Sequence, residues 1–135
     1  MRLGIVASRF NEEISGKILA SATAEAKKLG LEFEVTSVPG ALEIPSALQW
    51  LAQTSRFEAL VAIGCVIRGE TYHFEVVSNE SARGVMDVAL DFGLPVANGI
   101  LTTEDEAQAN ARVGKGAEAV RVAMEMAKLK AKLQA

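Results

Sequence analysis

Short apolar runs alternate along the chain with longer segments in which apolar residues recur every three or four positions. Three runs, 3–7, 59–66 and 95–101, are typical of strands buried in a sheet, and 59–66 is the most continuous of them. This run predicts a central strand that is covered on both faces. The segment 32–38 alternates apolar with polar residues, so it predicts a strand nearer the sheet edge.

The longer segments predict four helical regions, and several carry the boundary residues that helices favour. Gly30 and Gly93 stand where helices place a C-terminal cap, and Pro45 is tolerated only in a first turn. The expected helices cover about 12–29, 41–53, 74–92 and 104 to the C-terminus, the last with a break near 114–116.

Strands that alternate with helices imply parallel strands joined by right-handed crossovers, with helices on both faces of the sheet. No internal repeat or linker interrupts this order. We therefore expect one domain, 1–135, of the α/β class: a three-layer α/β/α sandwich around a four-stranded parallel sheet, doubly wound and flavodoxin-like. In such folds ligands bind outside the C-terminal ends of the strands.

Composition narrows the functional classes. Half of the 135 residues are apolar, and the net charge of −3 argues against nucleic acid or an anionic membrane as partner. A single cysteine, Cys65, excludes a disulfide within the chain and fits a reducing compartment. The sequence shows no secretory signal pattern and no apolar run long enough to cross a bilayer. We expect a cytoplasmic protein.

The turn before the third expected helix contains the only histidine, His73. An imidazole takes up and releases protons near neutral pH, which suits general acid–base chemistry, although a histidine here could instead cap or pack the helix. Gly69, Glu70 and Thr71 precede it. Free backbone amides at a helix N-terminus favour an anion, but the same residues would also suit an ordinary helix start capped by Thr71.

Other turns supply further candidates. Phe10 follows the first strand and could stack on a planar heterocycle or pack against the first helix. Glu43 could accept hydrogen bonds from hydroxyl groups or cap the second helix. Arg112 and Lys115 lie in the C-terminal helical region, where isolated basic residues usually face solvent. These residues alone indicate a phosphorylated or heterocyclic small molecule as ligand.

Several conspicuous residues have structural interpretations. Cys65 falls within the central strand and is expected to be a small buried hydrophobe. Trp50, Met86, Met124 and Met126 are expected to pack between helices.

The turns also carry four ordered motifs that span nearly the whole chain. They read SRFN at 8–11, VPGALEIP at 38–45, GCVIRGETYHFE at 64–75 and LTTE at 101–104, followed by Gln108, Arg112 and KGAEA at 115–119. In these motifs the sequence resembles the lumazine synthase family. The resemblance implies condensation of 5-amino-6-ribitylaminouracil with 3,4-dihydroxy-2-butanone 4-phosphate, without cofactor, metal or covalent enzyme nucleophile.

The resemblance also implies roles for individual residues. His73 would shuttle protons, and Phe10 would stack on the pyrimidine ring. The ribityl chain and the pyrimidine edge would contact Asn11, Ala41, Leu42, Glu43, Val66 and Ile67. The phosphate would bind Gly69, Glu70 and Thr71, with Arg112 as its charged partner.

The family builds its sites between subunits of a pentamer, so Asn98, Arg112 and Lys115 would complete a neighbour's pocket. Some members assemble pentamers further into a hollow icosahedral shell. Many members carry aromatic residues at the positions of Leu42 and Asn98, which leaves Phe10 as the main aromatic wall here. The connection between Arg112 and Lys115 is shorter than in many members.

Three other functions are compatible with such a domain. A non-catalytic shell protein would have no need for Phe10, Glu43, His73 and Arg112 together. A flavin or lumazine carrier would bind product tightly without turnover. A flavodoxin-like or signalling domain would carry a hydroxyl-rich phosphate loop or an acidic cluster after the first strand, and the sequence has neither.

Overall fold

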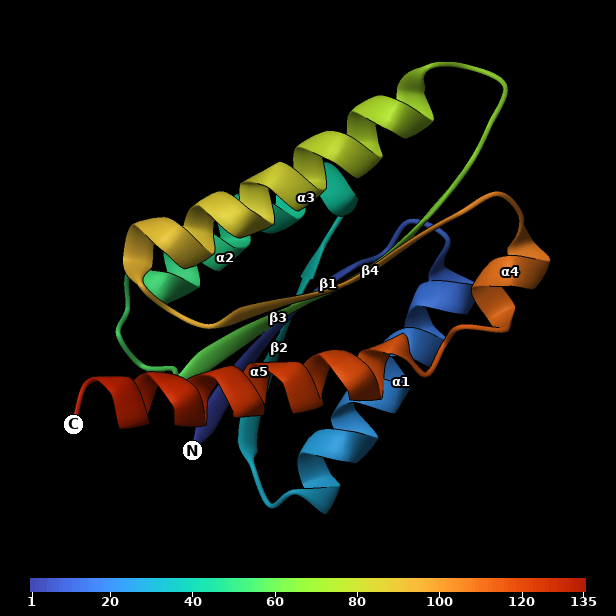
Figure 1. The fold of residues 1–135 in the computed structure, drawn as a ribbon. Coiled ribbons are helices and arrows are strands. Elements are labelled where there is room, and N and C mark those ends of the chain that lie inside the picture. Colours follow the sequence, from blue (N-terminus) through green and yellow to red (C-terminus); the bar gives the residue numbers. More distant parts are fainter.

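The computed structural model describes residues 1–135 and contains one sheet of four parallel strands (Figure 1). The strands lie in the order β2-β1-β3-β4, which places β3 inside the sheet and β2 at an edge. They are β1 (Arg2–Ser8), β2 (Glu32–Val38), β3 (Ala59–Ile67) and β4 (Val96–Thr103). All four strands predicted from the apolar pattern are confirmed.

Helices cover both faces of the sheet, as the flavodoxin-like three-layer sandwich requires (Figure 1). The pair α2 and α3 packs on one face and the pair α1 and α5 on the other. They are α1 (Glu12–Lys28), the 3₁₀ turn η1 (Ala41–Glu43), α2 (Ile44–Ala52), α3 (His73–Phe92), α4 (Glu106–Asn110) and α5 (Lys115–Leu133). The predicted break in the C-terminal helical region therefore falls before Lys115, slightly earlier than the sequence suggested.

The burial of each strand explains its sequence pattern. Every residue of β3 is buried except Ile67, because helices cover this strand on both sides. In β2 only Val38 is fully buried, which agrees with an edge strand. Cys65 is 1% exposed and packs in the core below α1 and α5, as predicted.

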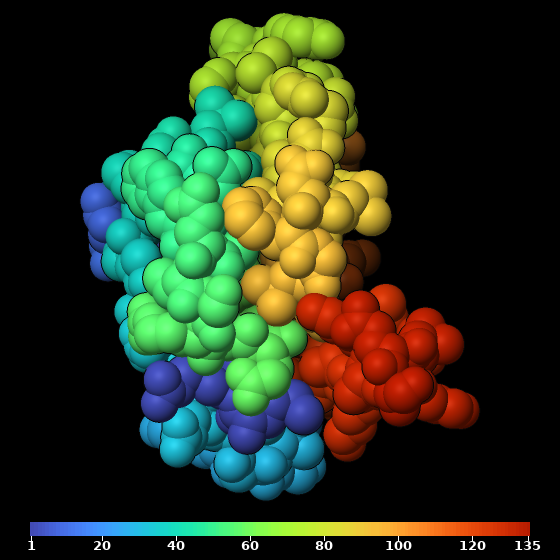
Figure 2. Space-filling model, turned by 90° about the vertical axis from the view of Figure 1, so that its left-hand side faces the viewer, coloured from blue at the N-terminus to red at the C-terminus, as the bar shows by residue number.

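Three residues expected to pack between helices do not do so within this chain. Trp50 is 64% exposed, Met86 59% and Met126 46%, whereas Met124 is buried as predicted. Met86 and Met126 line an apolar hollow of about 460 Å³ where the end of α3 and the start of β4 meet the C-terminal end of α5. Figure 2 shows this meeting of yellow-orange and red segments.

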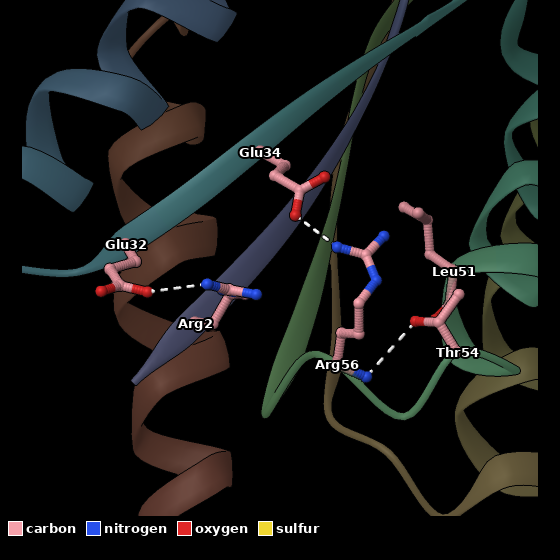
Figure 3. Close-up of polar contacts among 6 residues, drawn as sticks. All are labelled: Arg2, Glu32, Glu34, Leu51, Thr54 and Arg56. Atoms are coloured by element: carbon pink, nitrogen blue, oxygen red, sulfur yellow. Dashed lines mark hydrogen bonds and ion pairs between the residues drawn. The ribbon is translucent and has the colours of Figure 1, made fainter.

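Ion pairs decorate the end of the sheet at which its strands begin (Figure 3). Arg2 pairs with Glu32 across β1 and β2 at 3.1 Å, and Arg56 pairs with Glu34. The Arg56 guanidinium also lies 4.7 Å from the centre of the Phe57 ring. Exposed pairs of this kind contribute little to stability.

None of the helices combines the length and apolar content needed to cross a bilayer.

Candidate active site

A cleft of about 530 Å³ opens at the C-terminal ends of β1, β2 and β3, the edge at which this fold binds ligands. It gathers nine of the residues predicted for the site. These are Phe10, Ala41, Leu42, Glu43, Val66, Ile67, Gly69, Thr71 and His73.

Phe10 forms one wall of the cleft. The N–H of Arg9 donates to the carbonyl of Val38 (2.9 Å) and the N–H of Phe10 to that of Pro39 (3.1 Å), so pairing of the first two strands continues into the turn. The Arg9 guanidinium donates to Ser37 Oγ at 3.0 Å. The Phe10 ring is 68% exposed, so it is available for stacking and is not used for packing against α1.

Glu43 lines the same cleft from the 3₁₀ turn before α2. It occupies the N-cap position of α2 but makes no capping hydrogen bond with its side chain. Its carboxylate folds back toward Gly40, where a Cβ would lie 3.2 Å from Oε1. With no hydrogen-bond donor from the protein, both oxygens can accept from hydroxyl groups of a ligand.

Residues 69–72 form an exposed turn between β3 and α3. The backbone N–H groups of Gly69, Glu70 and Thr71 donate to no acceptor in the protein. They stand directly before a helix of 20 residues, whose N-terminal dipole favours an anion. Glu70 does not line the cleft, whereas Gly69 and Thr71 on either side of it do.

His73 is the first residue of α3, and its side chain is exposed on the cleft wall. The imidazole makes no hydrogen bond within the protein; only the backbone N–H is bonded, weakly, to Thr71 Oγ1 at 3.4 Å. The sequence left open whether His73 caps the helix or serves chemistry. The imidazole does not cap α3, because it forms no hydrogen bond to the helix, so it is free to exchange protons with a bound ligand.

Asn11 lies outside the cleft. Its backbone is left-handed, with φ 56°, a conformation that asparagine tolerates better than most residues. Its Nδ2 donates to the carbonyl of Cys65 at 2.9 Å, which ties the first turn to the end of β3. Asn11 therefore supports the cleft through the backbone it holds.

The remaining predicted residues lie in a second, polar pocket of about 690 Å³ beside β4, α4 and α5, or on β4 itself. Arg112 donates to the carbonyl of Gln108 at 2.9 Å, and Lys115 pairs with Glu118 at 3.3 Å. Asn98 lines neither pocket; its Oδ1 accepts the N–H of Ile100 at 2.9 Å. One chain thus holds two separate groups of predicted residues.

Comparison with known proteins agrees with these features. The model of the 6,7-dimethyl-8-ribityllumazine synthase family matches residues 1–131. The 6,7-dimethyl-8-ribityllumazine synthase of Nitrosomonas europaea is 59% identical over 94% of this chain and 80% of its own length. Those of Cupriavidus necator and Azoarcus sp. are 54% and 52% identical, over 98% and 99% of this chain and 82% and 88% of their own lengths.

The chain belongs to the lumazine synthase family. The resemblance drawn from the four sequence motifs is therefore confirmed.

The cleft also contains residues that were not predicted from the sequence. They are Pro39, Gly40, Cys65, Phe74 and Val77. Helical periodicity could have found Val77, because it stands four residues after His73 and shares its face of α3. Cys65 gave no such signal, since a cysteine in a buried strand looks like core. Burial raises the pKa of the Cys65 thiol, and Glu106 raises it further, so this thiol is not activated as a nucleophile.

Proposed function

We propose that this protein condenses 5-amino-6-ribitylaminouracil with 3,4-dihydroxy-2-butanone 4-phosphate to give 6,7-dimethyl-8-ribityllumazine, phosphate and water. One observation carries the proposal. A single cleft brings together an exposed aromatic ring, an unpaired carboxylate, unbonded amides before a long helix and the only histidine. Family membership supplies the substrates that fit this set.

The geometry of the cleft supports the roles that the family resemblance implies. Phe10 stacks on the pyrimidine, while Glu43 accepts hydrogen bonds from the ribityl hydroxyls. The amides of residues 69–71 hold the phosphate. Leu42, Val66 and Ile67 supply apolar walls that exclude water.

The reaction needs proximity and proton transfer. The pyrimidine amine attacks the ketone and loses water to form a Schiff base, phosphate leaves, and the ribitylamino nitrogen closes the second ring with loss of another water. His73 takes the proton from the attacking amine and returns it to departing oxygen. Holding two reactive partners together removes much of the entropic barrier, and no step calls for a cofactor.

We further propose a pentamer in which Asn98, Arg112 and Lys115 complete the neighbour's cleft. The cleft of one chain contains no lysine or arginine, so a bound phosphate has no cationic partner there. Arg112 and Lys115 stand in an open polar pocket of the same chain, available to face another copy. The apolar hollow at Met86 and Met126 provides surface to bury in such an assembly. We propose that this assembly is cytoplasmic, because the free thiol of Cys65 fits a reducing compartment.

The test is to mix purified protein with both substrates and follow lumazine absorbance and phosphate release together. Equal amounts of lumazine and phosphate, formed well above the spontaneous rate, are expected. Tight binding of lumazine without acceleration would point to a carrier. A folded oligomer that neither binds lumazine nor accelerates its formation would favour the non-catalytic shell protein.

A further inference from the structure

Arg68 occupies a junction between the two groups of site residues but lines neither pocket. It follows β3 directly, and its N–H donates to the carbonyl of Thr103 at 2.9 Å, which extends the β3–β4 pairing by one residue. Beyond it begins the turn 69–72 with the unbonded amides. Its position makes Arg68 the last residue of this segment that the sheet holds through the backbone.

The Arg68 side chain then grips three neighbours. Its Nη1 pairs with Glu75 in the first turn of α3, and its Nε donates to Glu104 at 2.6 Å, just after β4. The guanidinium lies 4.5 Å from the centre of the Phe74 ring. A planar guanidinium can serve two carboxylates and a ring face at once, which a lysine ammonium cannot.

The contacts of Arg68 with Glu75, Glu104 and Phe74, here called the Arg68 clasp, span the turn 69–72. Arg68 and Glu75 flank residues 69–72 and His73 in sequence, and their ion pair joins the two ends of that segment. The hydrogen bond from Arg68 holds the pKa of the Glu75 carboxyl below its usual range. Since the turn has few hydrogen bonds of its own, the clasp restrains it.

The same guanidinium reaches toward the polar pocket through a chain of hydrogen bonds. The backbone N–H of Glu104 donates to Gln108 Oε1 at 2.8 Å. The Gln108 carbonyl accepts from Arg112 at 2.9 Å. Hydrogen bonds, together with the residues Glu104 and Gln108 between them, therefore connect Arg68 to Arg112 of the same chain, whose expected phosphate lies in the neighbour's cleft.

We propose that Arg68 is a positioning residue that holds the amides of residues 69–71 and His73 in a fixed place through its contacts with Glu75, Glu104 and Phe74. This inference rests on the proposed function. Arg68 itself contacts no substrate; its effect passes through the turn it fastens.

The first test is Arg68→Met, which keeps much of the side-chain length and removes both ion pairs. We expect the KM for the sugar phosphate to rise about tenfold, since misplacing a binding group by a fraction of an ångström is costly. The KM for the pyrimidine should stay within about twofold, because Phe10 and Glu43 lie on other turns. Arg68→Lys should recover only part of the loss. Equal changes in both KM values, or none, would overturn the proposal.

The carboxylates distinguish positioning from simple charge attraction. Glu75→Gln with Glu104→Gln leaves Arg68 in place and makes the region more positive. If Arg68 only attracted phosphate as a charge, the KM for the sugar phosphate would fall. Under the positioning role it rises, as in Arg68→Met. A fall would overturn the proposal.

Arg56→Met is a matched control. Arg56 also pairs with a glutamate and lies over a phenylalanine ring, but at the other end of the sheet (Figure 3). It should leave both KM values unchanged while reproducing any general cost in stability. A loss of substrate affinity in Arg56→Met as large as that in Arg68→Met would mean that both effects are merely structural, and would overturn the proposal.

Binding of inorganic phosphate separates failure of this inference from failure of the proposed function. Amide NMR should show phosphate shifting the signals of residues 69–71 in the wild type, and these shifts should weaken in Arg68→Met. This result would support the clasp even if no lumazine formed. Amide shifts that persist unchanged in Arg68→Met would overturn it whatever the activity.

Discussion

Gly116 on α5 lies against the carbonyl oxygen of Ile18 on α1 so closely that a Cβ at position 116 would come within 2.0 Å of that oxygen. Next to it, the N–H of Ala117 donates to Ser21 Oγ at 3.0 Å. The two helices thus meet backbone to backbone at the start of α5. Because Lys115 precedes this contact directly, the crossing also sets where that lysine stands.

Gly116→Ala should destabilise the protein severely. The added methyl group would clash with the rigid backbone of α1, so the two helices must separate. We expect the free energy of unfolding to fall by about 3 kcal/mol or more. Thermal or denaturant unfolding would measure this. Gly16→Ala on α1 is the control: it has open space for a Cβ and should stabilise by about 0.5–1 kcal/mol. Equal stability of the two variants would contradict the close crossing.

His73→Ala should lower turnover by about a hundredfold, in the range for loss of a general acid–base group. The melting temperature should not change, because the side chain is exposed and makes no hydrogen bond within the protein. Single-turnover rates with both substrates saturating would isolate the chemical step. Unchanged turnover would remove His73 from the mechanism.

Arg112→Ala should raise the KM for the sugar phosphate by about tenfold to a hundredfold, the value of a hydrogen bond to a charged group. The pyrimidine KM should change much less. Steady-state kinetics with each substrate varied in turn would measure both KM values. The KM of Arg112→Lys for the sugar phosphate should lie between those of Arg112→Ala and the wild type. Equal effects on the two substrates would refute the phosphate assignment.

Mixing these two variants, assayed at a sugar phosphate concentration well below the raised KM, tests the shared site. If each site combines the cleft of one chain with the polar pocket of its neighbour, refolding His73→Ala with Arg112→Ala in equal amounts should restore about a quarter of the sites in the ring. Activity should then exceed that of either pure variant several-fold. A mixture no more active than the average of its components would show that each chain completes its own site.

The Cys65 thiol should resist thiol reagents at pH 8 in the folded protein and react once the protein unfolds. Burial raises its pKa above the ordinary 9.0, so the folded state keeps a proton that the unfolded state loses as pH rises past this value. The free energy of unfolding should consequently fall above pH 9 more steeply in the wild type than in Cys65→Ala. Parallel pH profiles, or rapid labelling of native protein, would contradict this.

Much of the fold followed from local patterns in the sequence. The continuous run in β3 reflects burial on both faces, and the polar positions in β2 reflect the exposure of an edge strand. The cleft followed because the C-terminal ends of parallel strands meet at one edge. Family motifs then selected nine of its lining residues.

What the sequence could not reveal depends on three-dimensional placement. The separation of Arg112 from His73 was expected only from the family resemblance, and it arises because β4 and α4 carry the arginine to a different pocket from that of β1 to β3. Asn11 lies next to Phe10, yet its left-handed backbone turns the amide toward β3. Trp50 was expected to be buried within the chain, but it is exposed. The apolar character of a helix residue predicts burial without telling whether the same chain or another copy buries it.

The bond from Ile100 to Asn98 bears on how copies of this chain can meet. β4 pairs with β3 on one side only, and its other side is an open edge of the kind that recruits foreign strands and seeds aggregation. By occupying the Ile100 amide, the Asn98 side chain withdraws one hydrogen-bond donor from that edge. This bond disfavours the addition of a further strand at the β4 edge. Contacts between copies at this edge are then made by side chains, which can distinguish between partners, whereas backbone pairing is largely independent of sequence.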